Sequence, residues 1–198
     1  MKQNLLLIIF LTIFSIGSAQ LIPYKSMEVV LENGDTISSI KGKLKLKTLK
    51  YKLLNSKDKP KKIDFSEIRT IKRWDSAFTN VETLHFFQTR ESEKYVHVKK
   101  IVEGEHLNVY GSSYSFSSAG AGGMTYYGSA IQYYVRKPNE DKVTYIGAYD
   151  AVLGEFKRRV YDYFSDCNQL LEALKDKRLR LRNGLEEIGV FYNNHCGK

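Results

Sequence analysis

Alternating apolar and polar positions between residues 27 and 147 predict short β-strands separated by turns. Ile40, Leu44 and Leu46 alternate with lysines, which is typical of a strand with one buried face. After Thr48 the apolar positions change phase, and they become Leu49, Tyr51 and Leu53. Because a straight strand cannot change faces, we expect a turn or a bulge at this point. Further strands are expected at 70–74, 82–87, 95–102, 107–110, 131–136 and 142–146.

The stretch 111–128 differs from the rest of this β-rich part because it is dominated by serine and glycine. Such a composition buries little apolar surface. We therefore expect a long mobile loop at 111–128, inside a β domain that covers residues 20–147.

The spacing becomes helical after Gly147. Four apolar residues recur at four-residue intervals, namely Val152, Phe156, Val160 and Phe164. Asp166 with Gln169, and Asn183 with Glu186, have the spacing of capping boxes that begin two further helices. The predicted fold class is therefore α+β. An antiparallel, twisted sheet or partial β-barrel is followed by a helical segment at 148–198 that packs on the sheet.

Residues 1–19 have the pattern of a secretory signal peptide. Lys2 provides the positive start, 5–16 is apolar, and Gly17 and Ala19 form a small-residue cleavage site before Gln20. The apolar run is too short for a membrane span. We therefore expect a chain that is exported to the periplasm, the cell surface or the medium, without a transmembrane segment after cleavage.

Cys167 and Cys196 are the only cysteines. An even number of cysteines in an oxidising compartment favours a disulfide, here closing a loop of about 29 residues. Metal binding or a redox-active pair is the weaker alternative, because no CxxC spacing is present.

The net charge of +9, of which Lys2 contributes one, leaves +8 on the chain from Gln20. Export argues against nucleic acid as the partner, so the expected partner is an anionic envelope component or another envelope protein. The segment 41–62 contains ten lysines and one acid, Asp58. Four alternating lysines form the candidate anion-binding site: Lys41, Lys43, Lys45 and Lys47. A solvated sheet face, or lysines that protect an edge strand, is the alternative interpretation.

Motifs for catalysis are not evident in the sequence, and no cofactor is predicted. The four histidines are dispersed, and only His97 and His106, on either side of a predicted turn, are placed to approach one another. Neither a GxSxG motif nor a helical Ser-x-x-Lys is present. We therefore expect neither catalytic nor metal-binding residues. Tyrosines 126, 127, 133, 134, 145 and 149 offer an alternative, a stacking platform for a glycan.

Several segments together resemble the small uncharacterised secreted proteins of the Bacteroidetes: NGDTI and KGK, DFSEI, VEGEHLNVY, IQYYVRK, and the tail FSDCNQLLEAL to LEEIGVFYNNHC. The resemblance implies a secreted protein with a β-rich body and a C-terminal helical segment with two cysteines. It implies no reaction. The expected function is that of a non-catalytic envelope-associated accessory or binding protein, and a hydrolase acting on an envelope polymer is the alternative.

Overall fold

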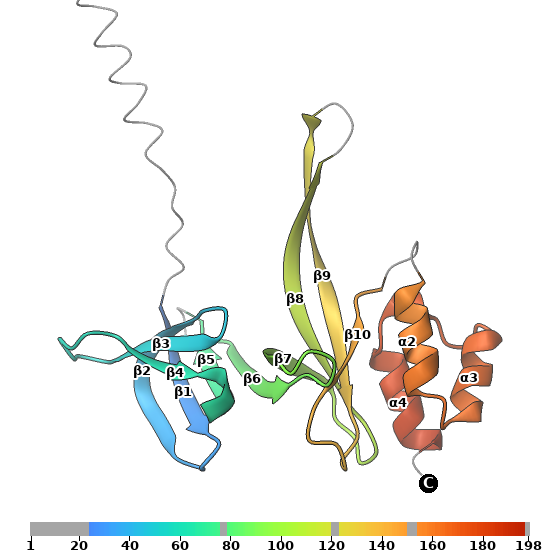
Figure 1. The fold of residues 1–198 in the computed structure, drawn as a ribbon, viewed down its shortest axis with the longest axis horizontal. Coiled ribbons are helices and arrows are strands. Elements are labelled where there is room, and N and C mark those ends of the chain that lie inside the picture. The colour runs from blue at the N-terminus through green and yellow to red at the C-terminus, as the bar shows by residue number, and fades with distance from the viewer. Residues whose placement is uncertain (1–23, 76–78, 120–122, 150–153, 197–198) are drawn as a thin grey trace, which may run out of the picture.

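The computed structural model of the protein describes residues 24–75, 79–119, 123–149 and 154–196. The predicted leader at 1–19, its cleavage site and Val152 lie outside these residues. Ten antiparallel strands followed by three helices confirm the α+β class (Figure 1). The strands are β1 (Lys25–Leu31), β2 (Thr36–Leu44), β3 (Thr48–Leu53), β4 (Lys61–Asp64), β5 (Ile68–Trp74), β6 (Val81–Gln88), β7 (Tyr95–Val102), β8 (Asn108–Ala119), β9 (Thr125–Arg136) and β10 (Thr144–Gly147).

The strands form one open sheet in the order β10-β9-β8-β7-β6-β5-β1-β2-β3-β4. Strand β1 is inserted between β2 and β5, whereas all other neighbours follow chain order. Because β10 and β4 are the two edges, the sheet does not close into a barrel.

The half of the sheet formed by β1 to β5 curls around its own core. A short 3₁₀ turn, η1 (Phe65–Glu67), places Phe65 in this core beside Phe86 of β6, with ring centres 4.9 Å apart. The buried residues of this cluster are Met27, Val29, Ile40, Leu49, Tyr51, Ile63, Phe65, Ile68, Ile71, Leu84 and Phe86. The strands of the N-terminal half therefore bury their apolar residues without help from the α-helices.

The turn between β2 and β3 explains the change of apolar phase at Thr48. Leu49 and Tyr51 are buried, as predicted, whereas the third residue of this set, Leu53, is 43% exposed. The expectation that Leu46 shares the buried face is wrong, because its side chain is 96% exposed. The chain leaves the strand after Leu44 and turns, with the Lys45 N–H donating to the Thr48 carbonyl at 2.8 Å.

Three helices cover the other end of the sheet: α2 (Glu155–Tyr163), α3 (Asn168–Lys175) and α4 (Glu186–His195). Phe156, Val160 and Phe164 are buried against Val109 and Val135 of the sheet, which confirms the predicted apolar spacing. The two predicted capping boxes are wrong, since the N-cap residues are Cys167 for α3 and Leu185 for α4. Within the described residues, no helix is long and apolar enough to cross a membrane.

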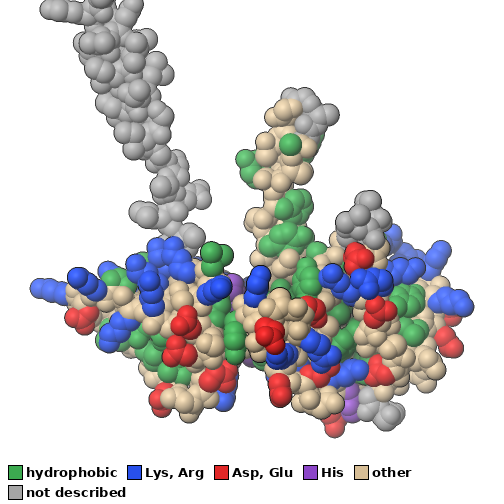
Figure 2. Space-filling model, in the orientation of Figure 1, with side chains coloured by type: hydrophobic (Ala, Val, Ile, Leu, Met, Phe, Trp, Pro, Cys, Tyr) green, Lys and Arg blue, Asp and Glu red, His purple; other side chains and the backbone are tan. Residues whose placement is uncertain are grey.

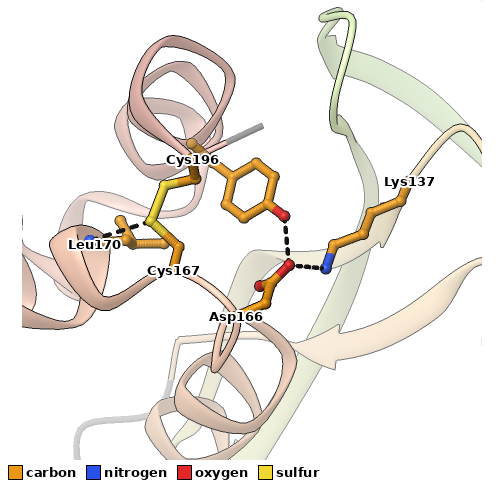
Figure 3. Close-up of a disulfide and its surroundings, with 6 residues drawn as sticks. Lys137, Asp166, Cys167, Leu170 and Cys196 are labelled. Atoms are coloured by element: carbon orange, nitrogen blue, oxygen red, sulfur yellow. Dashed lines mark hydrogen bonds and ion pairs between the residues drawn. A yellow bond between two sulfur atoms is a disulfide. The ribbon is translucent and has the colours of Figure 1, made fainter. Parts of the chain in front are cut away.

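The predicted disulfide joins the beginning of α3 to the end of α4. Cys167 and Cys196 are bonded, with their Cα atoms 5.5 Å apart. Cys167 is buried, and its Sγ atom accepts a hydrogen bond from the Leu170 N–H at 3.4 Å. The bond therefore both connects two helices and caps one of them (Figure 3).

Most of the described residues in 111–128 form strands, so the long loop that the composition predicts is wrong for 111–119 and 125–128. Strands β8 and β9 pair through twelve consecutive residue pairs from Asn108↔Arg136 to Ala119↔Thr125. The resulting ribbon projects far beyond the body of the sheet (Figure 1). The physical reason is alternation. Tyr114 and Phe116 share one face of the ribbon and the serines at 113, 115 and 117 lie on the other, and this period of two favours paired strands although little apolar surface is buried.

Candidate functional site

A dense accumulation of like charge lies on the outer face of β2, β3 and β4. The register places Lys41 opposite Lys52, Lys43 opposite Lys50, and Lys50 opposite Lys62. We call these five residues the lysine face. The intervening residues, among them Ile40, Leu49 and Tyr51, point to the opposite side and fill the N-terminal core. Figure 2 shows the corresponding basic side chains in blue at this end of the molecule.

The lysine face differs from the predicted site in two of four residues. Lys41 and Lys43 belong to it, whereas Lys45 and Lys47 lie in the turn between β2 and β3. Cross-strand pairing adds Lys50, Lys52 and Lys62 to it. The alternation of lysines from 41 to 47 did not predict these three residues.

Like charges directly opposite one another destabilise an antiparallel pair. Within the described part of the chain, none of the five lysines takes part in an ion pair. Protection of an edge strand does not explain Lys41 and Lys50, because strands pair on both sides of these residues. An external anion would offset the repulsion that this arrangement creates.

A second basic site is an open groove of about 780 Å³ at the centre of the sheet. Its lining includes residues of four adjacent strands, among them His85 and Phe87 from β6, Lys100 from β7, Asn108 and Tyr110 from β8, and Arg136 from β9. The guanidinium of Arg136 lies over the Phe87 ring, 4.7 Å from its centre. The groove therefore combines cations with aromatic surface.

Most charges in the groove are compensated. Lys100 binds Glu103 at 2.6 Å, and Arg69 lies 3.7 Å from Glu32. Burial, together with the charges of Lys100 and Arg136, lowers the pKa of His85 and so favours the neutral imidazole.

One polar pair in the groove lacks partners. The Asn108 Oδ1 and Arg136 Nε atoms are buried without a hydrogen bond, and their residues are directly opposite one another on β8 and β9. One atom accepts and the other donates, so a single hydroxyl or water molecule can satisfy both.

The histidines do not form a metal site in the described chain. His97 packs in the N-terminal core against Phe65 and Phe86, and burial lowers its pKa. His106 lies in the connection between β7 and β8. No group of three or more His, Cys, Asp or Glu side chains in the described residues is arranged to hold a metal ion.

The tyrosines do not form one stacking platform. Tyr134 is buried and packs against Tyr145, with ring centres 5.3 Å apart. Tyr133 points to the other side of the sheet, toward Phe156. Tyr127 is 84% exposed on the projecting ribbon.

Two polar clusters hold the helices to the sheet, and the sequence did not predict either of them. Asp166 accepts hydrogen bonds from Lys137 and Tyr192, each at 2.7 Å (Figure 3). Although burial opposes ionisation, these two donors lower the pKa of Asp166. The second cluster centres on Asn193 of α4, which is hydrogen-bonded to the connection between β7 and β8.

Comparison of the chain with protein-family models, with curated proteins and with solved structures gives no match. The resemblance to secreted Bacteroidetes proteins is therefore not supported by an identified family. The features that it implied for the fold are present, namely a β-rich body, C-terminal helices and a Cys167–Cys196 disulfide.

Proposed function

We propose that this protein is a non-catalytic binding protein of the cell envelope that contacts phosphate-bearing glycolipid or anionic lipid through its lysine face. The observation that carries the proposal is the pairing of Lys41 with Lys52 and of Lys43 with Lys50 on adjacent strands, without carboxylate partners in the described chain. A cluster of unpaired ammonium groups attracts anions because each new contact also relieves repulsion within the cluster.

The shape of the lysine face favours an extended anionic surface over a small ligand. Neighbouring strands lie about 4.8 Å apart, and alternate residues on a strand about 6.7 Å apart. Such a grid of charges matches an array of phosphate headgroups. The central groove is less suited to this role, because Lys100 and Arg69 already have acidic partners.

Export is part of the proposal. The leader pattern at 1–19 supports it, and the disulfide agrees with folding in an oxidising compartment. N-terminal sequencing of the protein from its native cell fraction should begin at Gln20 and read Gln-Leu-Ile-Pro. Recovery of the chain from the cytoplasm with Met1 in place would refute export.

Replacing Lys41, Lys43, Lys50 and Lys52 by Gln should weaken binding to phosphatidylglycerol vesicles or lipopolysaccharide by at least about 100-fold at low salt. The reason is that each basic residue near an anionic membrane contributes about 1 kcal/mol. The difference should shrink as salt rises, because screening shortens the range of these charges. Co-sedimentation with each kind of particle across a salt series measures the effect and distinguishes the two sources of phosphate.

The matched control removes four exposed and dispersed lysines elsewhere: Lys72, Lys94, Lys99 and Lys157. The control variant should bind within about threefold of the wild type, although its net charge equals that of the lysine-face variant. Equal weakening in both variants would mean that net charge alone attracts the particles. Wild-type binding by the lysine-face variant would leave these residues with a role in solubility only.

A further inference from the structure

The projecting part of the β8–β9 ribbon has two free edges. Strand β7 pairs with β8 only as far as Gly111, and β10 pairs with β9 only from Tyr133 to Val135. No described strand therefore pairs with the outer edges of Ser112–Ala119 or Thr125–Gln132. Each free edge presents a row of backbone N–H and C=O groups that can pair with another strand.

These edges carry none of the usual protection against strand addition. Natural edge strands are shielded by lysine, proline, bulges or short length. The sequence from Gly111 to Val135 contains no Lys, Arg, Asp, Glu or Pro, and the β8–β9 register has no bulge. Figure 2 shows the described part of the projecting ribbon without blue or red side chains, in contrast to the body of the molecule.

The ribbon also exposes aromatic side chains along one face. Tyr114 and Phe116 are 37% and 46% exposed, with ring centres 6.0 Å apart. Phe116 lies over Gly128 on the opposite strand, and Tyr126 is 59% exposed on the same face. A two-stranded ribbon is marginally stable in water by itself, so additional strands would stabilise it.

We infer that the free edge of β8 pairs antiparallel with the same edge of a second copy of this chain, forming a four-stranded sheet across a twofold axis. A strand from a second copy suits this edge because an uncharged surface is complementary to itself, whereas the charged side chains of an acidic or basic partner would find no opposite charge on it. The basic bodies repel one another, and the projection of the ribbon keeps them apart (Figure 1).

Strand β8 is preferred over β9 for this pairing. The free part of β8 contains no glycine, whereas the free part of β9 contains Gly128, which weakens a strand. An axis through Ser115 places Tyr114 of one copy opposite Phe116 of the other, a favourable aromatic pair. In this register the seven residues Ser112–Ser118 of each copy would pair and form roughly six to eight backbone hydrogen bonds.

Sedimentation equilibrium of the disulfide-bonded protein beginning at Gln20 tests this inference. The wild type should show a reversible, concentration-dependent dimer. The double variant Ser115→Lys/Ser117→Lys places ammonium groups opposite one another at the axis and should weaken dimerisation by at least about tenfold. The control Gln169→Lys/Asn194→Lys adds the same charge on exposed positions of α3 and α4, and should dimerise as the wild type does.

A second variant makes the test independent of added charge. Residues 113–131 are replaced by a short Gly-Ser turn, which shortens the projecting ribbon. This protein should be monomeric, with the circular dichroism and the melting temperature of its body preserved to within a few degrees, because the removed side chains lie outside the three buried clusters. A monomeric wild type, a dimer that survives the shortening, or equal weakening by the helix control would each overturn the inference.

Discussion

Replacing Asn193 by Ala is expected to lower the free energy of unfolding by about 3 kcal/mol. The Asn193 Oδ1 atom accepts from the N–H groups of His106 and Leu107, at 3.0 and 2.8 Å. Its Nδ2 group donates to the carbonyls of Leu107 and Gly189, each at 2.9 Å. Since Leu107 is fully buried, the alanine variant leaves backbone groups without partners in the interior.

Chemical denaturation in urea measures this loss as a shift of the midpoint at a constant slope. The adjacent Asn194 is the matched control, because it is exposed, and Asn194→Ala should change stability by less than about 0.5 kcal/mol. Asn193→Asp keeps the accepting oxygens and loses the donors, so its free energy of unfolding should lie between those of Asn193→Ala and Asn194→Ala. Equal stability of the Asn193→Ala and Asn194→Ala variants would show that the hydrogen bonds of Asn193 do not contribute to holding α4 on the sheet.

The sequence predicted those parts of the fold that repeat with a local period. Leu49 and Tyr51 are buried at alternate positions, and Phe156, Val160 and Phe164 are buried at helical spacing, because each pattern depends only on neighbouring residues. The disulfide followed from the number of cysteines. These signals identify which face of an element is buried, and they do not identify the element that covers it.

The features that were missed depend on contacts between distant residues. Asn193 is 87 residues from His106, and Lys137 is 29 residues from Asp166, so no local pattern records either contact. The spacing of Asp166 and Gln169 predicted a cap, but the Asp166 carboxylate is occupied by Lys137 and Tyr192. A polar Asn193 next to the buried Tyr192 was the one signal in the sequence that could have indicated a buried hydrogen-bonding role.

The lysine face, too, could be predicted from the sequence only where it depends on neighbouring residues of one strand. Alternation identified Lys41 and Lys43 as outward-facing residues, and the structure places them on that side. Their partners on β3 and β4 are defined by register, which the turn after Leu44 establishes. The candidate site could therefore be located on one strand from the sequence, but its extent across three strands could not.

Removal of the disulfide should have an effect of similar size to the loss of Asn193. The double variant Cys167→Ser/Cys196→Ser should be less stable by about 3.5 kcal/mol, the chain-entropy value for a loop of about 29 residues. Serine at position 167 can still cap α3, since its hydroxyl can accept from the Leu170 N–H that the Cys167 Sγ atom now accepts. Urea denaturation of oxidised wild type and of the variant gives the difference.

Comparison with Cys167→Ala/Cys196→Ala separates the two roles of Cys167. Alanine removes the cross-link and the cap together, so this variant should be about 1 kcal/mol less stable than the serine variant. In both, amide hydrogen exchange should increase first in α4, because Cys196 holds the end of that helix to the first turn of α3. Equal stability of the serine and alanine variants would show that the Sγ atom contributes only through the cross-link. Wild-type stability in both would mean that the contacts of Asp166 and Asn193 suffice to hold the three helices on the sheet.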